Sequence, residues 1–218
     1  MALRVVVEAT PKRAFASAID WPGWARSGRT ADEAIASLLA YAPRYTAVAK
    51  RARIAFSLPD LHDVETVERL SGGGSTEFGV PGEAARAEAE EVSGADLKRL
   101  IALLRAAWAT FDHAAGAAAN VTLATGPRGG GRSLAKMRDH VRDAELAYLG
   151  QLGSRPPGDR DDLGAIRDAF LETLTARVRD EPLANPRNTK EPWAPRYAVR
   201  RSAWHSLDHA WELEDRSA

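Results

Sequence analysis

The pattern of hydrophobic and polar residues changes character along the chain. Before about Pro81 the apolar residues fall in short, β-branched runs, and from Gly94 onward they recur every three or four residues. The first pattern is typical of strands and the second of amphipathic helices. The sequence therefore predicts an α+β protein with its strands in the N-terminal part and helices in the C-terminal part.

Several short segments of the N-terminal part are predicted to be strands. They are Leu3–Glu8, Ala14–Ile19, Trp24–Arg29, Arg53–Leu58 and Val64–Leu70. Trp21-Pro22-Gly23 predicts a turn between the second and third of these strands. The glycine-rich segment Ser71–Thr76 is predicted to be a flexible loop.

A helix is predicted between the third and fourth strands. Thr30 is a favourable N-cap, and Glu33, three residues later, completes a capping box. The apolar stripe that begins at Ala34 continues to Val48, and Pro43 within it predicts a kink or a break.

Four amphipathic helices are predicted in the C-terminal part. The first carries a stripe from Leu97 to Phe111, and the second is capped by Ser133. The third and fourth span Leu163–Val178 and Tyr197–Leu213. Helices of this length, separated by Gly- and Pro-rich loops, are typical of a helical bundle. We therefore expect two domains: a small α/β domain over residues 1–80, a linker over 81–93 and an antiparallel four-helix bundle over 94–218.

The composition narrows the chemistry and the partners. The 218 residues include 30 Lys and Arg and 30 Asp and Glu, and this balance gives no electrostatic reason to expect nucleic acid or a membrane surface as partner. The sequence shows neither a signal-peptide pattern nor a run of eighteen apolar residues, so we expect a cytoplasmic protein. Cysteine is absent, so any metal must be bound by imidazole and carboxylate groups.

Three of the five histidines are candidate metal ligands. His205 and His209 lie four residues apart on the fourth helix, so their rings point the same way, and His140 lies on the apolar stripe of the second helix. From the residues alone, metal binding and an ordinary structural role are equally good interpretations. His113 lies on the opposite face of its helix and His62 in a polar loop, so neither is expected to take part.

Other residues near these histidines are open to two interpretations. A carboxylate could orient a ligand imidazole or act as a general base, but an ordinary helix-surface role is favoured for Glu145, Asp208 and Glu212. Core packing is favoured for Trp193, Trp204 and Trp211. The segment Gly126–Ser133 nearly matches a phosphate-binding loop. Arg132 replaces its lysine, however, and the surroundings are helical, so a flexible connector is predicted.

Two C-terminal segments resemble the DinB/YfiT-like metal-binding superfamily. They are MRDHVRDAELAYLGQL and RRSAWHSLDHAWELEDR, and the resemblance covers about residues 95–216. In that family a histidine of the second helix and a late HxxxH pair bind one divalent metal ion. The resemblance thus implies that His140, His205 and His209 bind zinc, nickel or iron.

Three imidazoles leave coordination positions open for water or substrate, as in catalytic sites. Some members of the family are transferases or isomerases that use low-molecular-weight thiols. The resemblance therefore implies a metal-dependent enzyme acting on a small molecule, with a thiol S-transferase as the leading reaction. Because the chain has no cysteine, the thiol must be a separate cofactor. A metal-dependent hydrolase is the alternative enzyme.

The N-terminal segment AIDWPGWARSGRTADEAIASLLAYA resembles the HicB-like fold, which includes the antitoxins of toxin–antitoxin pairs. Any small βαβ-containing domain is an equally good interpretation of the same pattern. The resemblance suggests a non-enzymatic alternative, in which this domain binds a protein partner or a second copy of the chain as a homodimer. The bundle would then be a metal sensor or stabiliser.

Overall fold

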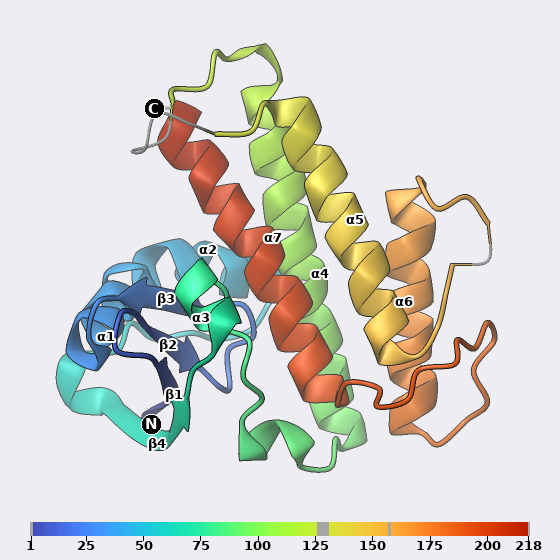
Figure 1. Cartoon of the computed structure of the whole chain (residues 1–218), viewed down its shortest axis with the longest axis horizontal. Coiled ribbons are helices and arrows are strands. Elements are labelled where there is room, and N and C mark those ends of the chain that lie inside the picture. The colour runs from blue at the N-terminus through green and yellow to red at the C-terminus, as the bar shows by residue number, and fades with distance from the viewer. Residues whose placement is uncertain (1, 126–130, 157, 218) are drawn as a thin grey trace.

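The computed structural model describes residues 2–125, 131–156 and 158–217 and shows a mixed α/β protein (Figure 1). A four-stranded sheet near the N-terminus is formed by β1 (Leu3–Ala9), β2 (Ala14–Ala18), β3 (Ala25–Gly28) and β4 (Val64–Ser71). The strand order is β3-β2-β1-β4, with β1 antiparallel to β2 and parallel to β4. No described helix is long and apolar enough to cross a membrane.

Helices make up most of the remaining structure. The N-terminal ones are α1 (Ala31–Ala40), α2 (Ala42–Arg51) and the short α3 (Gly74–Phe78). The long C-terminal helices are α4 (Gly94–Ala117), α5 (Leu134–Leu152), α6 (Leu163–Val178) and α7 (Pro195–Ser217). Short 3-10 turns occur at Leu61–Asp63, Arg86–Ala89 and Ala118–Asn120.

The break between α1 and α2 follows the local signals in the sequence. Thr30 accepts a hydrogen bond from the Glu33 backbone N–H, as predicted. The predicted capping box is not completed, because the Glu33 carboxylate accepts a hydrogen bond from the backbone N–H of Arg29 and not from that of Thr30. The helix ends before Tyr41, and Pro43 falls in the first turn of α2, where its missing N–H leaves no hydrogen bond unmade.

Two predictions about the N-terminal part are wrong. Arg53–Leu58 is not a strand: its backbone makes no ladder with the sheet, and Phe56 packs instead against Trp21 and Trp24. Arg53 has a positive φ of 59°, which redirects the chain as it leaves α2. The segment 71–76 is not simply a loop either, because it ends β4 and begins α3.

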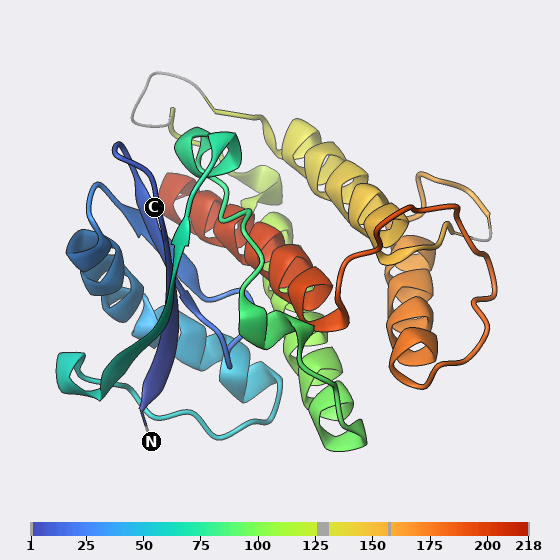
Figure 2. The ribbon, with the colours of Figure 1, turned by 60° about the horizontal axis from the view of Figure 1, so that its bottom comes forward.

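The sheet lies between two helical layers. Val5 and Val7 of β1 point to one face and belong to the same hydrophobic cluster as Leu38 of α1. Phe15 of β2 points to the other face and meets Trp204 of α7 edge to face, with ring centroids 6.3 Å apart. Figure 2 shows the sheet nearly edge-on between α1 and α7. The largest hydrophobic cluster runs without a break from the sheet into the long helices, and the two-domain division stays a prediction.

The four long helices pack side by side, and their polar contacts give their directions. Arg196 at the start of α7 bonds Asp96 at the start of α4, so these two helices run parallel. Arg177 near the end of α6 bonds the carbonyl of Leu152 at the end of α5, so that pair is also parallel. Figure 1 shows that α5 runs in the opposite direction to α7, and α6 in the opposite direction to α4, so the expected antiparallel relation applies to these two pairs.

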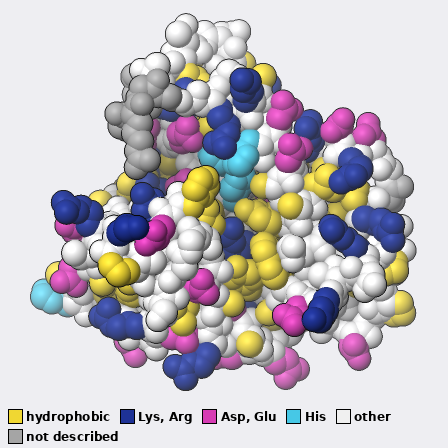
Figure 3. Space-filling model, viewed as in Figure 1, with side chains coloured by type: hydrophobic (Ala, Val, Ile, Leu, Met, Phe, Trp, Pro, Cys, Tyr) yellow, Lys and Arg dark blue, Asp and Glu magenta, His cyan; other side chains and the backbone are white. Residues whose placement is uncertain are grey.

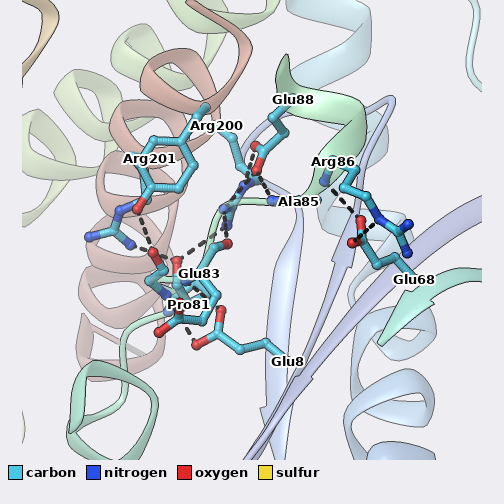
Figure 4. Close-up of polar contacts among 11 residues, drawn as sticks. Glu8, Glu68, Pro81, Glu83, Ala85, Arg86, Glu88, Arg200 and Arg201 are labelled. Carbon is cyan, nitrogen blue, oxygen red and sulfur yellow. Dashed lines mark hydrogen bonds and ion pairs between the residues drawn. The ribbon is translucent and has the colours of Figure 1, made fainter. Parts of the chain in front are cut away.

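The segment between the sheet and α4 is fastened to α7 (Figure 4). Arg200 of α7 forms a buried ion pair with Glu88, at 2.6 Å between Nε and Oε1. Glu8 of β1 accepts hydrogen bonds from the backbone N–H groups of Gly82 and Glu83 and from the Thr76 hydroxyl. These contacts tie the sheet, the connecting segment and α7 together.

Candidate metal centre

The structure brings together the three histidines that the sequence singled out. His140 comes from α5 and His205 and His209 from α7, and one ring nitrogen of each lies within 4.8 Å of the others. Nε2 of His140 and Nε2 of His205 are 3.0 Å apart. The predicted convergence of α5 and α7 at these residues is confirmed, and the group could hold a metal ion.

Helix geometry explains this convergence. His205 and His209 are one turn apart on α7, and their ring centroids are 4.6 Å apart. The antiparallel helix α5 places His140 over both rings, with centroid distances of 4.8 and 4.9 Å. Val141 beside His140 is fully buried and fixes this face of α5 against the core.

The neutral form is favoured for His140 and His205. His205 and His209 are buried, and His140 is partly exposed. Burial lowers the pKa of His205 well below its usual value, and His209 and His140 act in the same direction. The pKa of His140 is also lowered, first by burial and then by His209. Neutral rings carry the free lone pair that a metal ion requires.

The spacing of the nitrogens fits a single ion after a small adjustment. With metal–nitrogen bonds of about 2.0–2.1 Å, tetrahedral ligand nitrogens lie about 3.3 Å apart, and opposite ligands at most about 4.2 Å. The 3.0 Å between His140 and His205 is about 0.3 Å below the shorter value. A pair at the upper limit of 4.8 Å would need to close by about 0.6 Å for opposite ligands and by about 1.5 Å for tetrahedral ones, which side-chain rotation can supply.

Glu212 fixes the orientation of one ring. Its Oε2 lies 3.0 Å from Nδ1 of His209 and accepts a hydrogen bond from it, so Nε2 of that ring is left as the lone-pair donor. The hydrogen bond from His209 lowers the pKa of Glu212, and Arg216 acts in the same direction. The contact with His209 agrees with the alternative interpretation of Glu212, a carboxylate that orients an imidazole. Its i+3 spacing from His209 was the available signal.

The interpretation of Glu145 as a surface carboxylate is wrong. It is fully buried and accepts hydrogen bonds from Trp108 of α4 and from Ser202 and Ser206 of α7, at 2.7–3.1 Å. It thus joins α5 to both α4 and α7. Burial raises the pKa of Glu145, while Arg167 and these hydrogen bonds act in the opposite direction. The signal in the sequence was its spacing: Glu145 lies four residues after Val141 and four before Leu149, so all three share one face of α5.

The remaining candidates are not part of the histidine group. Asp208 turns toward the sheet and pairs with Arg26 of β3 at 3.0 Å. Trp204 and Trp211 are buried, as predicted. Trp193 is only partly buried and packs against Tyr148 and Tyr197. His62 and His113 are exposed, also as predicted.

The Gly-rich connector falls largely outside the described residues. Gly126–Gly130 are not described, so the comparison with a phosphate-binding loop stays untested there. Ser133, which is described, caps α5 by accepting a hydrogen bond from the N–H of Lys136.

The histidine cluster reaches the surface. Figure 3 shows histidine side chains in a hollow over α5 and α7, flanked by hydrophobic side chains, with a basic side chain lower in the same hollow. A site of this kind is accessible to a small molecule, in contrast to a metal sealed inside a core.

Comparisons with protein-family models, curated proteins and solved structures gave no match. The DinB-like and HicB-like assignments therefore stay predictions from the sequence, and the case for a site stands on the geometry of the three histidines.

Proposed function

We propose that His140, His205 and His209 bind one divalent metal ion and that the protein is a metal-dependent enzyme. The observation that carries the proposal is the convergence of three imidazole nitrogens, from two helices, within 4.8 Å. In this proposal the long helices form a DinB-like four-helix bundle and the sheet belongs to a HicB-like domain. Zinc, nickel and iron all suit imidazole ligands.

The ligand set supports catalysis over a structural role. Among the described residues no fourth His, Asp or Glu joins the group. Glu212, the nearest carboxylate partner, bonds the outer nitrogen of His209 instead. Structural zinc usually has four protein ligands, whereas three leave a position for water or substrate.

The reaction that we propose is a thiol-dependent S-transfer to a small electrophilic molecule. When bound, the metal would supply Lewis-acid chemistry by lowering the pKa of a thiol or of water. The chain holds His205 neutral by burial and orients His209 through Glu212. Because the sequence contains no cysteine, the thiol must be a separate cofactor. A hydrolase would use the same open position for water.

Metal analysis followed by an activity screen tests the proposal. The purified protein is expected to take up one zinc, nickel or iron ion per chain. His209→Ala should abolish uptake, whereas His113→Ala, which changes an exposed histidine, should not. The loaded protein is then assayed for conjugation of small thiols to electrophiles and for ester hydrolysis.

The outcomes separate the alternatives. Failure to take up metal, or equal uptake by His209→Ala, would refute the metal site. Hydrolysis without conjugation would replace the transferase by a hydrolase. Stoichiometric metal with neither activity would favour the sensor or stabiliser role, and a concentration-dependent dimer would support a second copy of the chain as partner.

A further inference from the structure

Arg201 places a buried positive charge beside the histidine cluster. It lies on α7 one helical turn before His205 and is only 7% exposed. A guanidinium stays protonated in proteins, so burial cannot neutralise it as it can a lysine or a histidine. Such a charge is costly unless an anion or several hydrogen bonds accompany it.

The preceding residue shows how this chain compensates a buried arginine. Arg200 is 5% exposed and donates to both carboxylate oxygens of Glu88, at 2.6 and 3.1 Å. It also donates to the carbonyl oxygens of Pro81 and Glu83. Every nitrogen of the Arg200 guanidinium therefore has a partner (Figure 4).

Arg201 has no comparable partner within the described parts of the chain. Its single hydrogen bond runs from one terminal nitrogen to the Pro81 carbonyl, at 3.0 Å. Nε is buried without a hydrogen-bond partner, and no described carboxylate lies within 4.0 Å. The rings of Tyr148 and Trp204, centred 5.7 and 5.2 Å from the guanidinium carbon, give partial compensation only.

The uncompensated side of Arg201 belongs to the same region as the histidines. The Tyr148 ring that faces Arg201 also packs edge-on against the His205 ring, with centroids 5.8 Å apart. The charge of Arg201 contributes to the lowered pKa of His205, after burial and the two neighbouring histidines.

We propose that Arg201 binds the carboxylate of the thiol co-substrate, so that the thiol group is held at the histidine cluster. The inference rests on the function proposed above and names the chemical class of its co-substrate. Nε is buried, but the second terminal nitrogen is not among the fully buried atoms and has no protein hydrogen-bond partner, so it is the donor that can contact a carboxylate. Tyr148 lines the space between the carboxylate and the thiol.

Matched thiols and cobalt-loaded protein test this inference. Cobalt(II) is loaded at the cluster, and its visible absorption is titrated with 3-mercaptopropionate and with the neutral 3-mercaptopropionamide. We expect the carboxylate thiol to bind at least about tenfold more tightly, the effect of a charge-assisted contact of about 1.4 kcal/mol. Arg201→Gln should reduce the ratio to about twofold or less, and Arg201→Lys should keep part of it.

A control variant and the cobalt spectrum keep the outcomes distinct. Arg179→Gln removes the same charge from an exposed position and should leave the ratio unchanged. Equal ratios in wild type and Arg201→Gln, with cobalt bound in both, would overturn the anion site while leaving the metal site intact. No cobalt uptake by the wild type would overturn the metal site and the inference with it. Without thiol, the Arg201 variants should unfold at the same temperature as the wild type, and this result excludes a merely structural effect of the substitutions.

Discussion

Replacing Glu145 is expected to destabilise the protein more than any exposed substitution on the same helix. The carboxyl group is fully buried and accepts hydrogen bonds from Trp108, Ser202 and Ser206. In Glu145→Ala the two serine hydroxyls can turn to helix carbonyls, and the Trp108 N–H keeps its contact with Ser202 at 3.0 Å. The loss is therefore smaller than the number of broken bonds suggests.

The magnitude follows from two contributions. Two net hydrogen bonds at about 1 kcal/mol each, together with about 1 kcal/mol for the space left by the side chain, give a loss of about 3 kcal/mol. Asp143→Ala, an exposed change two residues earlier, should cost less than about 0.5 kcal/mol. Urea unfolding followed by circular dichroism measures both. A Glu145→Ala cost within about 1 kcal/mol of the Asp143→Ala cost would refute the reasoning.

The same residue predicts a pH dependence. Burial raises the pKa of Glu145 above its unfolded value of 4.5, so its contribution to stability is fully present below pH 4.5 and is lost as pH rises through the folded-state pKa. Glu145→Gln has no proton to lose. The stability of this variant relative to wild type should therefore increase between pH 4.5 and pH 8, and a constant difference would contradict the raised pKa.

Three further predictions concern the cluster and α7. His205→Ala should lose the metal and any activity but keep its helical circular dichroism, because apolar packing supplies most of the folding energy. Loss of both metal and helicity would mean that the ion is structural. Glu212→Gln should weaken metal binding about 10- to 100-fold in a chelator competition, with exposed Glu214→Gln as the unaffected control. Glu88→Ala should lower the free energy of unfolding by about 3–5 kcal/mol in urea, because it leaves Arg200 buried without its anion; a cost below about 1 kcal/mol would contradict this.

Local signals in the sequence predicted local structure well. The Thr30 cap, the break at Pro43 and the inward-facing His205 and His209 each depend on residues a few positions apart, and the structure has all of them. The position of His140 beside that pair needed only the further assumption that two apolar stripes pack together.

Features that depend on tertiary packing were less predictable. Ile54, Phe56 and Leu58 alternate as in a strand, yet the sheet offers them no partner, and Phe56 joins an aromatic cluster instead. Arg201 looks in the sequence like any helix-surface cation. Its burial follows from the way the connecting segment at Pro81 lies against α7.

The position of α7 in the chain also has a consequence for folding during synthesis. The ion pair between Arg26 and Asp208 joins residues 182 positions apart, and Trp204 covers Phe15 across a similar separation. At about 5–20 residues per second, a ribosome takes roughly ten to forty seconds to proceed from β1 to α7. Throughout that interval one hydrophobic face of the nascent sheet lacks the helix that covers it, and this is the surface on which a chaperone would act. Contacts between residues so far apart in the sequence also favour slow folding of the complete protein.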